Sequence, residues 1–298
     1  MSRSSWGLLL CSLFSMAALI NAAGPRASTE THRAERKTDI EYANVAGVSL
    51  RLDASIPQDA KAAPAVIIVH GGGWVAGNRR VDVAPLFTPL TDAGFAWFSI
   101  DYRLATDVTQ FGIAIEDVES AVRFVKTHAS EFHVDPNRIA LIGESAGGQL
   151  AAMAALRAGP DASVRAVAAL YAPSDLVALL KNSNYVPAQI RESVVGTPWE
   201  RMILAGLSGL SPIDNVRPDM PPFLLIHGTA DPLVPFEQST AMCSRMRQAG
   251  ASCQIYPVQG AGHGIRWWET NSDIRTAYKE KLIQWLNAEL GILAAVRS

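Results

Sequence analysis

The sequence predicts an α/β domain in which helices flank a mostly parallel central sheet and a helical, cap-like insertion interrupts the pattern. Short apolar, β-branched runs alternate along the chain with longer segments of helical periodicity, which is typical of βαβ units. The 298 residues are 49% hydrophobic with a formal net charge of −2, a composition that suits a large core and argues against disorder. A near-neutral chain also lacks the basic surface that nucleic-acid binding requires, so we expect no nucleic-acid partner.

Residues 1–23 have the layout of a secretory signal peptide. Arg3 precedes an apolar stretch over residues 7–20, and the small residues Ala22 and Ala23 follow it, as in export signals. The stretch is short for a membrane span of about 20 residues, although an uncleaved anchor remains the alternative. We therefore expect a secreted or periplasmic protein with no stable membrane insertion after cleavage.

Cleavage would leave Cys243 and Cys253 as the cysteines of the mature chain. An even number of cysteines in an exported protein suggests a disulfide, and two separate buried thiols are the alternative. The sequence has no CxxC pair and no His/Cys cluster, so we expect no zinc site.

The expected domain covers residues 40–298 and follows a polar lead over residues 24–39. Two short strands separated by Gly47 open it, and the later strands are continuous apolar runs of the kind that a buried parallel strand needs. The expected strands are residues 40–42, 48–54, 65–70, 96–101, 138–143, 164–170, 222–227 and 252–258, with a turn at 135–137.

Helices are expected between these strands. Ile115, Val118, Val122 and Val125 share one face at helical spacing, which predicts an amphipathic helix. The expected helices are residues 115–125, 146–156, 237–248 and 274–290. Residues 174–219 break the alternation as a long, partly helical insertion, and insertions near the carboxyl ends of strands often cover an active site.

The segment Gly143-Glu144-Ser145-Ala146-Gly147 matches the G-x-S-x-G pattern between a predicted strand and a predicted helix, the setting of a nucleophile elbow. In so tight a turn, side chains at Gly143 and Gly147 would collide with neighbouring backbone. The turn would lift the Ser145 hydroxyl above the sheet edge and direct the Ala146 N–H at developing negative charge. We expect Ser145 to be a nucleophile; a serine cap on an ordinary helix is the alternative.

The segment His-Gly-Gly-Gly-Trp at residues 70–74 follows the strand at 65–70. Three glycines allow close approach of the backbone to a ligand and present N–H groups that no side chain screens, which suits an oxyanion hole. A phosphate-binding loop is the rival, but the Walker Lys-Ser/Thr and the GxGxxG spacing are missing. His70 itself is expected to tether the loop.

A serine nucleophile needs a base and an acid that orients the base. His263 lies in the glycine-rich segment 260–264 after the last predicted strand and is the best candidate base. Asp231 follows the preceding strand and is the best candidate acid, with Asp175 in reserve.

These segments resemble those of α/β-hydrolase esterases, over about residues 40–290. The most similar groups are the hormone-sensitive-lipase-like bacterial esterases and the secreted acetyl- and feruloyl-esterase-like enzymes, and the chain order Ser…Asp…His is that of the α/β-hydrolase fold. The resemblance is carried by HGGGW (70–74), DYRL (101–104), GESAGG (143–148), HGTADPLVP (227–235) and GAGHG (260–264).

The resemblance implies a set of site residues. They are Ser145 as nucleophile, His263 as base, Asp231 as acid, and the N–H groups of Gly72, Gly73 and Ala146 as the oxyanion hole. Two departures from the family pattern matter: the first is mild, and the second favours the carbohydrate-esterase-like group. Glu144 stands where many relatives have Asp, and residues 105–107 read Ala-Thr-Asp in place of Ala-Pro-Glu, without the N-terminal cap helices of the lipase-like group.

We expect a carboxylesterase that hydrolyses short-chain, aryl or carbohydrate esters by two-step acyl transfer and needs no metal or organic cofactor. Its partner would be a small ester or an esterified polysaccharide, and the sequence predicts no oligomeric state. Two alternatives remain. An exopeptidase of the prolyl-oligopeptidase clan shares the motif and its order but usually has a long N-terminal propeller, whereas about 40 residues precede the first strand here. A non-catalytic binding protein of this fold would normally have lost one of these motifs.

Overall fold

The computed structural model describes residues 33–106, 110, 112–183, 186 and 188–291. All of these residues belong to one compact unit of the chain. The predicted signal peptide, residues 1–23, lies outside the described residues.

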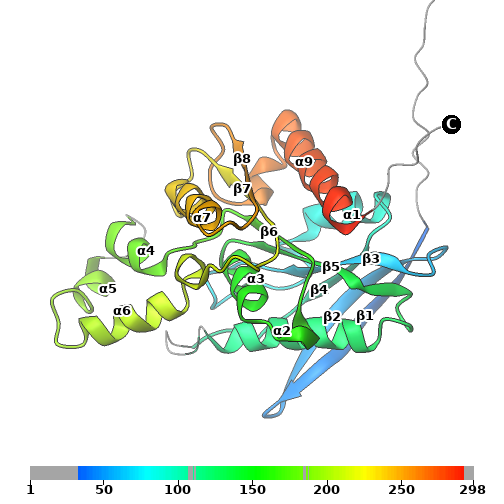
Figure 1. The fold of residues 1–298 in the computed structure, drawn as a ribbon, viewed down its shortest axis with the longest axis horizontal. Helices are drawn as coiled ribbons and strands as arrows, with labels where there is room; N and C mark the ends of the chain where they lie inside the picture. The colour runs from blue at the N-terminus through cyan, green and yellow to red at the C-terminus, as the bar shows by residue number, and fades with distance from the viewer. Residues whose placement is uncertain (1–32, 107–109, 111, 184–185, 187, 292–298) are drawn as a thin grey trace, which may run out of the picture. The chain divides into compact units, whose positions relative to one another are not determined.

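Within the described residues, eight strands form one sheet in the order β1-β2-β4-β3-β5-β6-β7-β8 (Figure 1). The pairs from β4 to β8 are parallel, whereas β1–β2 and β2–β4 are antiparallel. The prediction of a mostly parallel sheet is confirmed. The strands are β1 (Ala34–Val45), β2 (Val48–Pro57), β3 (Ala63–Val69), β4 (Ala96–Ile100), β5 (Val134–Glu144), β6 (Ala166–Leu170), β7 (Phe223–Gly228) and β8 (Cys253–Val258).

The hairpin of β1 and β2 corrects the predicted start of the domain. β1 begins at Ala34, so the polar lead predicted over residues 24–39 overlaps this strand, and the strand predicted at 40–42 was too short. Because β1 lies at the sheet edge and pairs with β2 in register with two slips, most of its side chains are solvated. Backbone hydrogen bonds hold such an edge strand in place, and its polar sequence lacks the apolar pattern from which strands are predicted.

Helices cover both faces of the sheet (Figure 1). Outside the insertion they are η1 (Ala84–Leu86), α1 (Phe87–Asp92), α2 (Ile113–Thr127), α3 (Ala146–Arg157), η3 (Pro160–Ala162), α7 (Glu237–Gln248), α8 (Ile265–Trp268) and α9 (Ser272–Leu290). The four predicted helices are all present. The turn predicted at 135–137 was wrong, because β5 runs through it, although the Asn137 N–H does bond Asp135 Oδ1 at 2.9 Å as in a turn.

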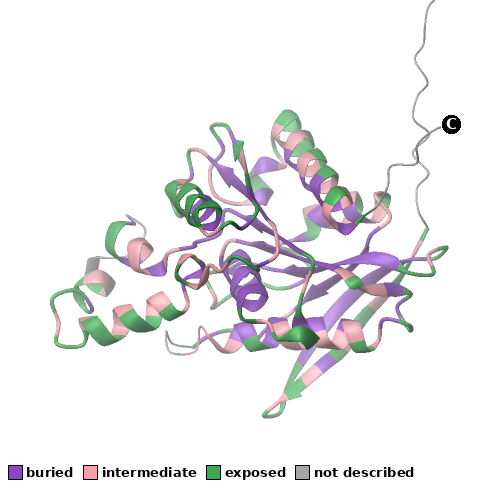
Figure 2. Ribbon diagram, viewed as in Figure 1, coloured by how far each residue is buried: buried purple, intermediate pink, exposed green. Residues whose placement is uncertain are grey.

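The core consists of two apolar layers, one on each face of the sheet. Side chains of β3 alternate between them, since successive residues of a strand point to opposite faces. Ala65, Ile67 and Val69 pack with α2, α3 and α7, whereas Val66 and Ile68 pack with α1, α8 and α9. Figure 2 shows the sheet as the most buried part of the chain, with exposed residues on the outer faces of the helices.

The insertion predicted at residues 174–219 is a set of helices between β6 and β7, hereafter the cap. It contains α4 (Leu176–Asn182), α5 (Ala188–Glu192), α6 (Glu200–Gly209) and η4 (Pro212–Asn215). The first three extend away from the sheet, at the left of Figure 1. None of the ten residues of α6, all of which are described, is buried, so the sheet contributes little to holding this helix.

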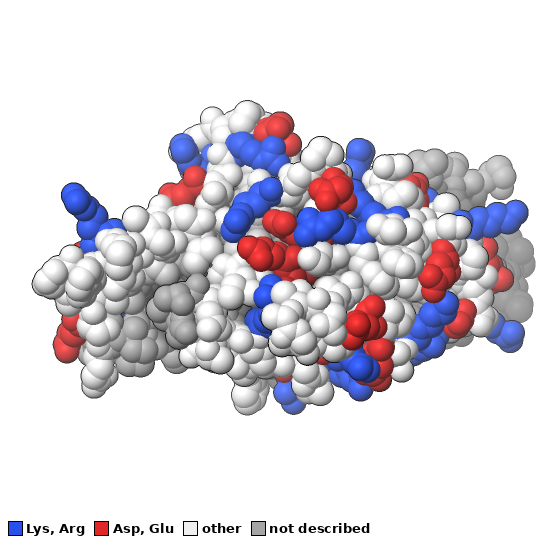
Figure 3. All heavy atoms as spheres, turned by 90° about the horizontal axis from the view of Figure 1, so that it is seen from below, with Lys and Arg blue, Asp and Glu red and all other residues white. Residues whose placement is uncertain are grey.

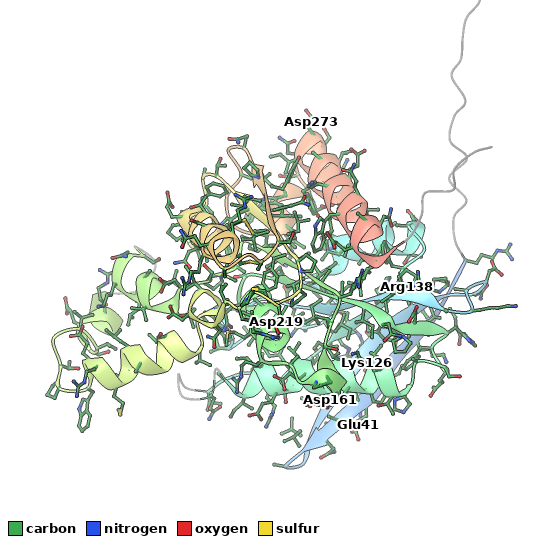
Figure 4. All side chains as sticks on the ribbon, viewed as in Figure 1. Glu41, Lys126, Arg138, Asp161, Asp219 and Asp273 are labelled. Atoms are coloured by element: carbon green, nitrogen blue, oxygen red, sulfur yellow. A yellow bond between two sulfur atoms is a disulfide. The ribbon has the colours of Figure 1, made fainter. Side chains whose placement is uncertain are left out.

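The surface carries both signs of charge. On the face seen in Figure 3, Lys and Arg side chains are interspersed with Asp and Glu. Lys126 lies at the end of α2 and Asp161 in η3 (Figure 4): burial lowers the pKa of the Lys126 ammonium, and the Asp161 carboxylate partly offsets that effect. This mixture fits a net charge of −2.

Cys243 of α7 and Cys253 of β8 are joined by a disulfide. It ties the helix to the first residue of the strand that follows it. In the described part of the chain, the helices fall short of the length and apolar character needed to span a bilayer.

Candidate active site

Ser145 lies at a strained turn between β5 and α3. Its φ of 52° and ψ of −123° lie outside the regions that side chains favour, and such strain is typically found at functional sites. A Cβ at Gly143 would lie 2.2 Å from the Gly147 oxygen, and one at Gly147 would lie 2.2 Å from the His70 oxygen. Glycine is therefore required at both positions, because the turn packs against its own backbone and against the loop after β3.

The loops after β7 and β8 bring Asp231 and His263 to Ser145. The Ser145 Oγ lies 2.9 Å from His263 Nε2, and His263 Nδ1 lies 2.7 Å from Asp231 Oδ2. Glycine at position 228 allows the two loops to approach closely, because a Cβ there would lie 2.2 Å from the Ala261 oxygen. Three residues separated widely in the chain thus form one hydrogen-bonded series at the carboxyl edge of the sheet.

The Asp231 carboxylate is held in its charged form. Burial would raise its pKa, but hydrogen bonds with His227 and His263 oppose burial and bring the pKa well below the usual range. Its other oxygen, Oδ1, accepts the N–H groups of Leu233 and Val234, each at 2.9 Å. A charged carboxylate can only accept, so the His263 Nδ1 carries the proton and the Nε2 accepts the Ser145 hydroxyl proton.

The glycine loop lies beside this series. Gly72 and Gly73 have φ values of 103° and 61°, and a Cβ at Gly72 would lie 2.1 Å from the Ala76 oxygen. The Gly71 N–H donates to Glu144 Oε1 at 2.6 Å. Since Gly71 is committed to Glu144, the donors of this loop for a ligand would come from Gly72 and Gly73, next to Ala146 at the start of α3.

Further contacts fix this loop from several sides. The ring of His70 stacks on Tyr102 at 4.3 Å, and the Tyr102 hydroxyl donates to the His70 and Gly71 oxygens at 3.1 Å. Burial lowers the pKa of His70. Gln149 of α3 accepts the Trp74 indole N–H at 2.9 Å. His70 is thus a buried part of the loop, in the place expected of a tether.

The chain beyond the glycine loop is anchored by ion pairs. Arg79 pairs with Asp39, Asp53 and Asp101, and Arg80 pairs with Asp39 and Asp53 at 2.7 and 2.5 Å. Asp39 and Asp53 belong to the β1–β2 hairpin. The hairpin therefore stabilises the segment that leads out of the candidate oxyanion hole.

Glu144 and Tyr171 connect the loops, and the sequence analysis gave neither a role at the site. Burial raises the pKa of the Glu144 carboxyl, although hydrogen bonds from Tyr171 and from the Gly71 N–H oppose this. The Tyr171 hydroxyl accepts the Ile265 N–H at 2.9 Å, and its ring packs edge-on against His263, 4.7 Å between centroids. The sequence signal for Tyr171 was its position directly after the buried strand β6.

Asp175, the reserve acid, takes no part in the series. Its carboxylate accepts the Ala178 N–H at 2.8 Å and so caps the N-terminus of α4. His227, to which the sequence analysis gave no role, lies instead beside Asp231, with its Nε2 3.4 Å from Asp231 Oδ2. Among the residues that the structure describes, no group of three His, Cys, Asp or Glu side chains could hold a metal ion.

The fold is similar to solved structures of esterases. The apo form of Thermogutta terrifontis esterase 2 matches with a TM-score of 0.70 and 28% identity, over 91% of this chain and 99% of that one. A truncated carbohydrate esterase from gut microbiota matches with a TM-score of 0.73 and 26% identity, over 88% and 98%. The predicted α/β-hydrolase fold is confirmed.

Relatives found by sequence similarity are also named as esterases or ester hydrolases. Esterase LipC of Mycobacterium tuberculosis is 34% identical over 222 residues, which are 69% of this chain and 54% of LipC. The probable carboxylic ester hydrolase LipM of the same organism is 31% identical over 204 residues, 65% of this chain and 47% of LipM. The chain thus spans about half the length of these relatives.

The profile of the BD-FAE family matches residues 52–246. That match runs from within β2 to within α7 and includes Ser145 and Asp231, while His263 lies beyond its end. Together with the α/β-hydrolase fold and the esterase relatives, it identifies the chain as a member of the BD-FAE family.

Proposed function

We propose that the protein is a serine carboxylic-ester hydrolase. The observation that carries this proposal is the hydrogen-bonded series from Asp231 through His263 to Ser145, with Ser145 on a strained turn beside a glycine loop. A nucleophile bonded to a base, and a base bonded to an orienting acid, is the arrangement that acyl transfer needs. Relatives and structural neighbours named as esterases support the same reaction class.

The first half-reaction acylates the enzyme. The Ser145 Oγ attacks the carbonyl carbon of the ester while its proton passes to His263 Nε2, and Asp231 stabilises the imidazolium that forms. The oxyanion receives hydrogen bonds from the N–H groups of Gly72, Gly73 and Ala146, each of which contributes a factor of about 10²–10³ to the rate. His263 then protonates the leaving alcohol, and the acyl group stays on Ser145.

The second half-reaction uses the same groups. Water loses a proton to His263 Nε2 and attacks the acyl carbonyl, and the new tetrahedral intermediate collapses with return of the proton to Ser145. The products are a carboxylic acid and an alcohol. The hydrogen bond between Ser145 and His263 supports the proton transfer within the protein, and the proposed cycle uses no cofactor.

Short acyl groups on an aryl or carbohydrate alcohol are the proposed substrates. Two structural neighbours support this proposal: the Thermogutta terrifontis esterase has been solved with propionate and with butyrate bound, and another neighbour is described as a carbohydrate esterase.

Initial rates on p-nitrophenyl acetate, butyrate and octanoate test the proposal, with Ser145→Ala as the blank. We expect hydrolysis of acetate and butyrate that falls by about 10⁴-fold or more in the variant, as when a serine nucleophile is removed. Near-wild-type activity in Ser145→Ala would refute the role of Ser145. A preference for octanoate would reject the short-chain assignment, and activity on a dipeptidyl nitroanilide alone would favour a peptidase.

Export to the periplasm or the medium is part of the proposal. The signal-like residues 1–23 and the disulfide between Cys243 and Cys253 support it, since structural disulfides form in oxidising compartments. N-terminal sequencing of the protein from the periplasmic fraction is expected to start near Gly24. Full-length protein with reduced cysteines in the cytoplasm would contradict export.

A further inference from the structure

A second histidine lies behind the acid. His227 is the penultimate residue of β7, and both its side chain and that of Asp231 are completely buried. Its Nε2 lies 2.9 Å from the Val234 oxygen and 3.4 Å from Asp231 Oδ2, and its Nδ1 lies 2.7 Å from Ser239 Oγ. The proposed reaction gives this ring no part, yet each of its nitrogens has a polar partner.

The partners determine which nitrogen of His227 carries a proton. A carbonyl oxygen only accepts hydrogen bonds, so the Nε2 must be the N–H that faces Val234. In the neutral ring the Nδ1 then accepts, and the Ser239 hydroxyl donates to it. The single Nε2–H is therefore directed at the Val234 carbonyl with the Asp231 carboxylate at its side.

His227 and Asp231 hold the same residue from two sides. The Val234 oxygen accepts from the His227 Nε2–H, and the Val234 N–H donates to Asp231 Oδ1, both at 2.9 Å. The second oxygen, Oδ2, receives His263 Nδ1 and lies nearest to His227. Rotation of the carboxylate away from His263 would break the bond to Val234 and separate Oδ2 from His227.

We propose that His227 is a positioning residue that fixes the plane of the Asp231 carboxylate, so that Oδ2 stays aligned with the His263 Nδ1–H. His227 acts through Asp231 and touches no reacting atom. The inference rests on the proposed function, because it assigns His227 a share in the same acid–base series. It concerns the rate of the chemical steps rather than the binding of the ester.

Two substitutions separate the hydrogen bond from the volume of the ring. His227→Gln places an amide N–H close to the position of Nε2 and keeps the donor. His227→Asn keeps a polar group toward Ser239 but is too short to reach Val234 and Asp231. His128→Asn is the matched control, because the His128 ring also contacts a backbone oxygen at 2.9 Å, at the end of α2 and away from Ser145.

We expect His227→Asn to lower kcat for p-nitrophenyl acetate by about 10–100-fold, the scale seen when partners behind metal-binding histidines are removed. KM should change less than twofold, His227→Gln should retain kcat within about threefold, and His128→Asn should match the wild type. The His263 Nδ1–H should show a low-field proton resonance in the wild type and in His227→Gln that is lost or shifted upfield in His227→Asn.

Several outcomes would overturn the inference. A folded His227→Asn variant with unchanged kcat and resonance would do so, and so would equal losses in the Asn and Gln variants, because the donor would then be irrelevant. If His227→Asn does not fold, Ser239→Ala gives the answer: removal of the hydroxyl that holds the Nδ1 side of the ring should lower kcat severalfold at constant KM, and an unchanged kcat rejects the inference. Activity retained in Ser145→Ala would instead refute the proposed function itself.

Discussion

The ends of β5, β7 and β8 and the cap are built in different ways. At the strand ends, Asp231 and His227 are completely buried and each polar atom of the Asp231 carboxylate has a partner. In the cap, α6 contributes no buried residue, although all of its positions are described, and Trp199 and Met202 are 64% and 65% exposed. The difference separates two tasks: the sheet fixes the groups that would react, and the cap presents a surface that can vary without disturbing them.

The largest effect is expected at the strand ends. Asp231→Asn replaces an acceptor by an amide that can donate to His263 and favour the wrong tautomer, so kcat should fall by about 10³–10⁴-fold. Hydrolysis of p-nitrophenyl acetate measures the loss, with thermal melting as a check of folding. Asp175→Asn, at the N-terminus of α4, is the control, and its kcat should stay within about twofold of the wild type. Equal losses of kcat in both variants would mean that the cap also holds the reacting groups.

Truncation of a buried side chain in the sheet should show how much the core contributes to stability. Leu141 of β5 is fully buried in the apolar layer under α2 and α3, so Leu141→Ala should lower the free energy of unfolding by about 2–5 kcal/mol. Urea denaturation measures it. A decrease in the free energy of unfolding of less than about 1 kcal/mol would show that the sheet is not packed more tightly than the cap.

Acid should weaken the anchor of the glycine loop. Burial raises the pKa of Asp53, but hydrogen bonds from Arg80, Arg79 and the Asp39 N–H outweigh it and bring the pKa to about 2. This is below the ordinary value of about 3.9, so the carboxylate stabilises the folded state fully above pH 4, and that stabilisation is lost as pH falls towards 2.

The melting temperatures of wild type and Asp53→Asn should therefore differ most at pH 7 and converge between about pH 4 and pH 2. Subtraction of the variant removes the contribution of the other carboxylates. A difference that is constant over this range would show that the ion pairs with Arg79 and Arg80 contribute nothing that depends on charge.

The smallest effect is expected in the cap. Met202→Ala removes a side chain of similar size to Leu141, but from an exposed position on α6, so the free energy of unfolding should change by less than about 0.5 kcal/mol. The same urea experiment compares it directly with Leu141→Ala. A loss of several kcal/mol would show that α6 packs against more than its exposure indicates and would remove the contrast between the two regions.

Residue patterns were enough to predict the parallel sheet and to single out Ser145, Asp231 and His263, which meet in the structure, because buried strands and tight glycine turns depend on local sequence. The strand of Ala65 to Val69 is apolar at each position, and the glycines beside Ser145 are required by contacts within their own turn. Most of β1 was missed because it is a polar strand at the sheet edge. α1 was missed because it is only six residues long and contains Pro89.

The contacts behind the triad could not be predicted from the sequence. Glu144 and Tyr171 make hydrogen bonds between segments that are far apart in the chain, Gly71 to Glu144 and Ile265 to Tyr171. His227 instead bonds Val234 and Ser239, which follow it within 12 residues. Each of these side chains is compatible with an ordinary buried strand end. Which of them meet depends on how the sheet arranges its edges, and periodicity does not encode that.

The backbone at Ser145 implies a trade between catalysis and thermostability. A non-glycine residue in such a conformation costs about 1–3 kcal/mol, whereas glycine adopts it freely. Ser145→Gly and Ser145→Ala both abolish the nucleophile, but only the first relieves the turn. At most positions a glycine lowers the melting temperature relative to alanine, but here Ser145→Gly should have the higher melting temperature of the two variants. The difference between them would measure the thermostability that the chain loses by keeping a serine at this turn.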